Sequence, residues 1–192
     1  MAISKIANQL KIWRDNRGAA AVEFALIVPF LTIILINVVS FFDGFRGNLA
    51  VSRATVVLVD LVTRDQGGVD DDDFTELVSI AQGLVGSYSE DSNFTVTISS
   101  IRNTFDTGGD TDPTLVWSRS NDDAKALSQS DLDDLDLPSI PEGDSVILTQ
   151  IEANYTPFLV NEILGEFLLS AYLTRRPRFV SEVACTSDAD KC

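Results

Sequence analysis

Residues 19–42 read AAAVEFALIVPFLTIILINVVSFF, and no charged residue occurs from Phe24 to Phe42. As a helix, this stretch would be about 36 Å long, enough to cross a hydrocarbon core of about 30 Å. A buried core helix is the alternative, but so small a chain could hardly surround a helix that is apolar on every face. A cleaved secretory signal fits poorly, because the run is long and FFDGFRGNLA after it lacks a small-x-small site. We predict a transmembrane helix that the mature protein keeps.

Charge is divided between a basic start and an acidic body. The 192 residues include 14 basic and 29 acidic side chains, with a formal net charge of −15. Residues 1–18 are basic, although they contain one acid, Asp15. Their bases are Lys5, Lys11, Arg14 and Arg17. Because basic flanks of membrane spans stay in the cytoplasm, the acidic body is expected on the other side of the membrane.

Composition also limits the possible chemistry. The negative charge argues against a nucleic-acid partner, which needs clustered Lys and Arg. The chain has no histidine, which removes Ser-His and Cys-His triads and His-ligated zinc. Acidic clusters at 70–73, 106–112 and 131–136 lack the ligand spacing of an EF-hand, so we interpret them as helix-start or solvated acids and leave calcium open. We expect no enzyme, no catalytic residue, no cofactor and no resident metal.

Two residues in the apolar stretch need an explanation. Glu23 is a carboxylate at the start of a membrane span, where an unpaired buried charge is costly. It could be an interfacial residue that reaches the lipid headgroups. Pro29 removes one helical hydrogen bond, which predicts a kink or local melting.

The residues just upstream change the interpretation. Arg17-Gly18 followed by AAAVEF and an apolar run resembles a type IV prepilin cleavage motif, and the string RGAAAVEFALIVPFL is similar to the TadE/TadF-like pseudopilins of the tight-adherence (Tad, or Flp) pilus system. The resemblance covers about the first 65 residues and returns weakly at 175–179. It implies that Gly18 is the last leader residue, that Ala19 is the new N-terminus, and that Glu23 contacts a neighbouring subunit. The new α-amine of Ala19 could then neutralise Glu23 within one chain or between chains.

The resemblance also implies partners and a place in the cell. It implies a minor pilin that a prepilin peptidase matures and that meets other pilins, minor pilins and the inner-membrane assembly platform. It implies a single-pass protein of the bacterial cytoplasmic membrane, with its globular part outside the cytoplasm and available to a surface pilus. A signal-anchored periplasmic binding or sensory domain without cleavage is the alternative. A membrane-tethered hydrolase is a third class, for which we find no nucleophile or metal constellation.

We predict an α+β fold in four parts: a leader (1–18), the transmembrane helix (19–42), its continuation outside the membrane (43–66) and a globular head (67–192). Gly44 and Gly47 could permit a bend where the helix leaves the membrane. The head should hold a small antiparallel sheet with packed helices. Strands are predicted at 94–102, 114–120, 145–155 and 170–178, a turn at 107–113, helices at 70–85 and 160–168, and partly helical structure at 122–138.

Two cysteines, Cys185 and Cys192, lie at the C-terminal end of the sequence. An even cysteine number and an extracytoplasmic head favour a disulfide between them. A metal clip is the weaker interpretation, because two further ligands are missing. We therefore predict a disulfide that closes the C-terminal tail.

Overall fold

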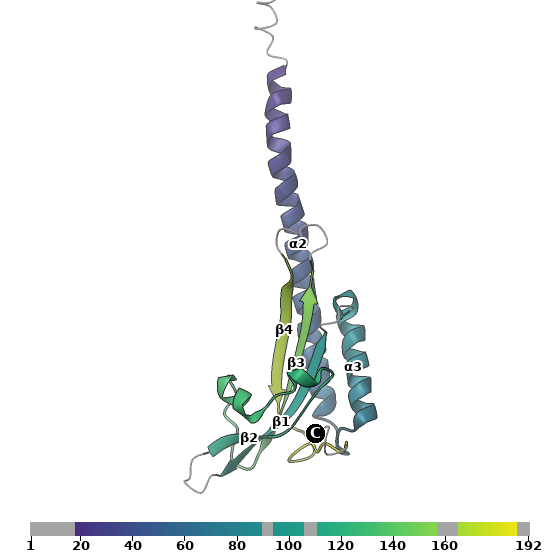
Figure 1. The fold of residues 1–192 in the computed structure, drawn as a ribbon, viewed down its shortest axis with the longest axis vertical. Helices are drawn as coiled ribbons and strands as arrows, with labels where there is room; N and C mark the ends of the chain where they lie inside the picture. The colour runs from purple at the N-terminus through teal and green to yellow at the C-terminus, as the bar shows by residue number, and fades with distance from the viewer. Residues whose placement is uncertain (1–17, 90–93, 106–110, 157–164, 188–192) are drawn as a thin grey trace, which may run out of the picture.

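The computed structural model describes residues 18–89, 94–105, 111–156 and 165–187. Its longest element is the helix α2 (Ala19–Val62), which has 44 residues and is therefore about 66 Å long. Figure 1 shows α2 as the long axis of the molecule, with the sheet and α3 beside its lower half and with its upper half projecting alone. The helix is continuous through Pro29 and through both Gly44 and Gly47.

Burial divides α2 into a free half and a packed half. The first buried residue lies about halfway along the helix, and those after Gly47 follow helical spacing, as expected for one face against a core. They are Ser40, Gly47, Val51, Ala54, Thr55, Leu58, Val59 and Val62. The helix ends at Val62, four residues before the predicted end of the continuation at residue 66. A turn follows, in which Gly68 has a φ of +93° that suits glycine.

The head contains a four-stranded antiparallel sheet in the order β2-β1-β3-β4. The strands are β1 (Thr95–Phe105), β2 (Thr111–Ser120), β3 (Ser145–Tyr155) and β4 (Phe167–Arg175). The predicted α+β fold, with a long apolar helix and a small antiparallel sheet packed on helices, is therefore confirmed.

Most predicted strands differ from the observed ones by a few residues, and two predicted elements need correction. The third strand has the predicted bounds, 145–155, and is an interior strand. Strand β2 begins at Thr111, inside the predicted turn at 107–113. Strand β4 begins at Phe167, where the predicted helix 160–168 should still continue. Residues 160–164 of that predicted helix lie outside the described residues.

Helix α3 (Asp71–Val85) packs antiparallel beside α2 and carries the predicted acidic start. Asp70 is its N-cap: the side chain accepts a 2.8 Å hydrogen bond from the Asp73 amide, and the Asp73 carboxylate accepts one from the Asp70 amide. This reciprocal capping box explains two of the four consecutive acids as helix-start residues. The 3₁₀ helix η2 (Gly86–Ser89) follows α3 directly.

Two apolar clusters stabilise the head, one on each face of the sheet. The larger cluster lies between the sheet, α2 and α3, and includes Val51, Leu58, Phe74, Ile98 and Ile151. The smaller lies on the other face, where the 3₁₀ helix η4 (Gln129–Asp134) forms part of the cover; the 3₁₀ helix η3 (Asp123–Lys125) precedes η4 along the chain. The sheet is therefore buried on both faces over part of its length, which agrees with the unbroken burial of 145–149 in β3.

The chain after β4 returns to the far end of α2. The Arg178 amide donates to the Thr63 carbonyl at 2.9 Å, and Cys185 forms a parallel β-bridge with Val69. Cys192 lies outside the described residues, so the disulfide from Cys185 stays a prediction.

Candidate functional site

The most unusual surface of the protein is the free half of α2, residues 19–39, and the turn that follows it. Among the described residues, α2 is the one helix long and apolar enough to cross a membrane. Its large apolar side chains are exposed on every face. They are Val22, Phe24, Leu26, Ile27, Phe30, Leu31, Ile33, Ile34, Leu35, Val38, Val39, Phe41 and Phe42. A continuous apolar surface of this size needs lipid or protein around it.

Two polar side chains in this half bond to their own helix. The Thr32 hydroxyl donates to the Val28 carbonyl at 2.9 Å, and the Asn37 amide donates to the Ile33 carbonyl at 2.8 Å. Each side chain thus satisfies one donor hydrogen one turn back along α2, without water. This arrangement is compatible with a hydrocarbon environment, where an unsatisfied donor is costly.

The predicted processing and contact residues lie at the free end of α2. Gly18 is the N-cap residue, and open space surrounds the position where a Cβ would stand. The regular helix begins at Ala19, and Glu23 is exposed one turn later. No described residue forms an ion pair with Glu23. The structure places these three residues near one another on one exposed helix end, away from the head.

A polar junction marks the border between the free half and the head. Asp43 accepts a hydrogen bond from the Tyr88 hydroxyl on Oδ1 at 2.8 Å and from the Tyr155 hydroxyl on Oδ2 at 2.9 Å. Tyr155 also donates weakly to the Ser40 carbonyl at 3.4 Å. The two rings are tilted at 58° with centroids 5.7 Å apart, a favourable aromatic pair. One carboxylate of α2 therefore joins η2 and the end of β3.

The junction changes the acidity of both phenols. Burial, and then the hydrogen bond to the Asp43 carboxylate and its charge, raise the pKa of Tyr155 to about 12. The same causes raise the pKa of Tyr88 above its ordinary value, although the nearby Arg46 opposes the shift. Both hydroxyls therefore keep their protons, and remain donors, through the physiological pH range.

Gly44 and Gly47 allow close packing at this junction, rather than the bend that the sequence suggested. A Cβ at Gly47 would lie 2.8 Å from Leu169 Cδ1 and 3.0 Å from the Tyr88 ring. A Cβ at Gly44 would lie 3.3 Å from the Tyr155 ring. The missing side chains bring β4 and both tyrosines close to the helix backbone.

A second junction joins the other end of α2 to the chain after the sheet. Asp60 pairs with Arg64 on its own helix at 2.7 Å, with Arg175 at the end of β4 at 3.0 Å, and with Arg178 at 2.6 Å. Two of these arginines belong to the string 175–179 in which the pilin resemblance returned. Their ion pairs with Asp60 join β4 and the chain that follows it to α2.

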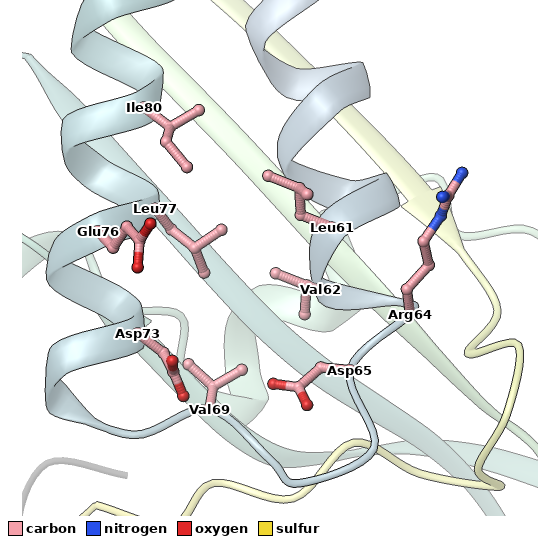
Figure 2. A pocket seen from close by; sticks show the side chains of 9 residues that line it. All are labelled: Leu61, Val62, Arg64, Asp65, Val69, Asp73, Glu76, Leu77 and Ile80. Atoms are coloured by element: carbon pink, nitrogen blue, oxygen red, sulfur yellow. The ribbon is translucent and has the colours of Figure 1, made fainter.

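A groove of about 330 Å³ lies between the end of α2 and α3, as Figure 2 shows. Its apolar lining is Leu61, Val62, Val69, Leu77 and Ile80, with charged groups of Arg64, Asp65, Asp73 and Glu76 at its edge. Three of these charged groups have partners within the fold. Arg64 pairs with Asp60, Asp65 accepts from the Gly67 amide, and Asp73 completes the capping box. The groove holds no constellation of reactive side chains.

No group of three or more potential metal-ligating side chains occurs in the described parts of the chain. Several acids of the candidate calcium clusters bond within the fold. Asp71 pairs with Arg119, whose guanidinium also lies 4.6 Å from the centre of the Phe74 ring. Asp131 accepts from the Ser128 amide and hydroxyl, which lowers the pKa of that carboxyl. Asp106 and Asp110 lie outside the described residues.

The sequence did not indicate the junction around Asp43. Its one local signal is that Asp43 is the first charged residue after the apolar run, at the predicted membrane exit. The tyrosines that complete it lie 45 and 112 residues further along the chain. Comparison of the chain with protein-family models, with curated proteins and with solved structures finds no match.

Proposed function

We propose that this protein is a minor pilin or pseudopilin of a Tad-type pilus, anchored by residues 19–42 in the bacterial cytoplasmic membrane with its head outside the cytoplasm. In this proposal a prepilin peptidase cleaves after Gly18, and the mature chain joins other pilins and the assembly platform. A Cys185–Cys192 disulfide would close the tail in that oxidising compartment.

The observation that carries the proposal is the form of α2. Its free half leaves a span of about 20 residues outside the head, which matches the thickness of a hydrocarbon core. Ala19, the expected new N-terminus, is also the first residue of the regular helix. Cleavage there would remove the leader without shortening the span, and would leave a helix that starts with an α-amine.

Glu23 gives the proposal its association chemistry. The carboxylate is exposed on the free half and has no ionic partner among the described residues. In a bilayer such a charge is unfavourable until a cation approaches it. The α-amine of Ala19 on a neighbouring subunit would supply that cation, so burial of the pair would favour one register between packed helices.

Mass spectrometry of the membrane-extracted protein tests the proposal. In cells with an active prepilin peptidase we expect a chain that begins at Ala19. The Gly18→Trp variant should keep its leader, because the bulky indole would not fit where the peptidase accommodates a glycine. Gly83→Trp is the matched control: Gly83 is also surrounded by open space, but lies in α3. A native protein that keeps its leader would overturn the proposal and favour an uncleaved signal-anchored domain.

A further inference from the structure

The membrane-side end of the head exposes apolar side chains where the span ends. Phe167 and Leu168, the first residues of β4, are 44% and 58% exposed, and Phe45 on α2 is also exposed. We name these three residues the collar. The described residues of the head leave these apolar side chains exposed, and an external apolar partner would cover them.

Strand register gives the collar its level along α2. Phe167 pairs with Tyr155 across the sheet, and Tyr155 bonds to Asp43 and to the Ser40 carbonyl. Leu169, two residues after Phe167, lies against Gly47. The start of β4 therefore lies beside residues 40–47 of α2, and Figure 1 shows this end of β4 nearest the free half.

Helix length then gives the collar its depth. From Ala19, a hydrocarbon core of about 30 Å takes about 20 residues and ends near Val38 or Val39. The headgroup region adds about 5–7 Å on each side, which is three to five more residues. Phe167 and Leu168 fall at this level, where aromatic side chains are enriched in membrane proteins.

Charge at the same level agrees with a phospholipid partner. Arg46 follows Phe45, is exposed, and forms no ion pair with any described residue. A guanidinium at the end of a span can reach the lipid phosphates. The acid nearest to Arg46 in sequence, Asp43, already accepts hydrogen bonds from two tyrosine hydroxyls.

We infer that the collar inserts into the outer-leaflet interface of a phospholipid bilayer, so that the head rests on the membrane. This inference rests on the proposed membrane anchor. It predicts that the head is held by contacts at its base as well as by α2, and that extraction of the subunit from the membrane must break both.

Fluorescence quenching in phosphatidylcholine nanodiscs, with lipids brominated near the headgroup end of the acyl chain, tests the inference. The full chain carries Trp13→Phe as background, which leaves the buried Trp117 as the native emitter. Phe167→Trp should lose most of its added emission in brominated nanodiscs. Phe179→Trp is the control: this position is 63% exposed but follows Arg178, which bonds to the far end of α2, so its emission should be unchanged.

A third tryptophan separates the collar from the anchor. Phe30→Trp lies near the middle of the proposed span, about 16 Å along the helix from Ala19, and should be quenched in nanodiscs whose lipids are brominated near the acyl-chain terminus if residues 19–42 cross the bilayer. Quenching of Phe30→Trp without quenching of Phe167→Trp would overturn the collar and leave the anchor intact. Failure of both would overturn the anchor and the collar that rests on it.

Two further outcomes are decisive. A blue shift of Phe167→Trp that occurs without quenching means that protein, such as a second copy of the chain, covers this position, and it overturns the inference. Should Phe167→Trp fail to fold, Leu168→Trp gives the same reading from the neighbouring exposed position, with quenching supporting the collar and its absence overturning it.

Discussion

Removal of one hydroxyl at the junction should measurably loosen the head from its helix. Tyr155→Phe deletes the 2.9 Å donor to Asp43 Oδ2 and keeps the ring, so it creates no cavity. A hydrogen bond to a charged group contributes about 1.5–3 kcal/mol. We expect the lower part of that range, about 1.5–2 kcal/mol, because Tyr88 still donates to the other carboxylate oxygen. In a chain of this length the loss lowers the melting temperature by about 3–8 °C.

Thermal unfolding of the full chain in nanodiscs, followed by near-ultraviolet circular dichroism, measures the change. Tyr172→Phe is the matched control, because Tyr172 is 56% exposed and its hydroxyl has no hydrogen-bond partner among the described residues. Hydrogen exchange should also quicken at residues 43–51 of α2 in Tyr155→Phe alone. Equal melting temperatures for the two variants would refute the reasoning. A double-mutant cycle with Asp43→Ala would then show no coupling.

Three further predictions concern titration, a buried hydroxyl and the free helix end. Folding raises the pKa of Tyr155 to about 12, so the contribution of this hydroxyl to the free energy of unfolding is complete below pH 10 and is lost as the pH rises to about 12. Unfolding curves across that interval should show a falling free energy of unfolding, and Tyr155→Phe should reduce the fall. Thr149→Val should raise the melting temperature, because the Thr149 hydroxyl is buried and has no hydrogen-bond partner in the described structure. Thr97→Val should lower the melting temperature, because the Thr97 hydroxyl donates a hydrogen bond to Ser120 at 3.0 Å. Glu23→Gln should stay processed and membrane-bound but co-purify less with other pilins; unchanged co-purification would return Glu23 to a headgroup-facing residue.

Local patterns predicted the elements whose burial follows a simple period. The apolar run and the acidic start of α3 depend on residues that are neighbours in sequence, so both elements could be predicted from the sequence alone. Strand β3 was found at its observed bounds because turn residues flank a strongly apolar, β-branched segment. Phe167 and Leu168 were placed in a helix because a short apolar run has no decisive period, and only the pairing with β3 selects a strand.

The candidate site divides in the same way. Gly18, Ala19 and Glu23 are close in sequence, so their proximity on one helix end could be predicted. The junction around Asp43 could not, because its tyrosines reach it only through the packing of α3 and the sheet against α2. The sequence singled out Gly44 and Gly47 as a possible bend. The close packing that Gly47 allows depends on Leu169 and Tyr88, which no local sequence pattern connects to it.

The continuity of α2 has a mechanical consequence. A force applied to the free half along the helix axis passes through the main-chain hydrogen bonds of one unbroken helix to Val62, and so enters the centre of the head rather than a linker at its edge. Strands β3 and β4 lie alongside the same helix, so the force would shear their contacts with α2 all together instead of peeling them one at a time. Such a subunit would follow its helix as a rigid body, and a machine that grips only the helix would move the whole head.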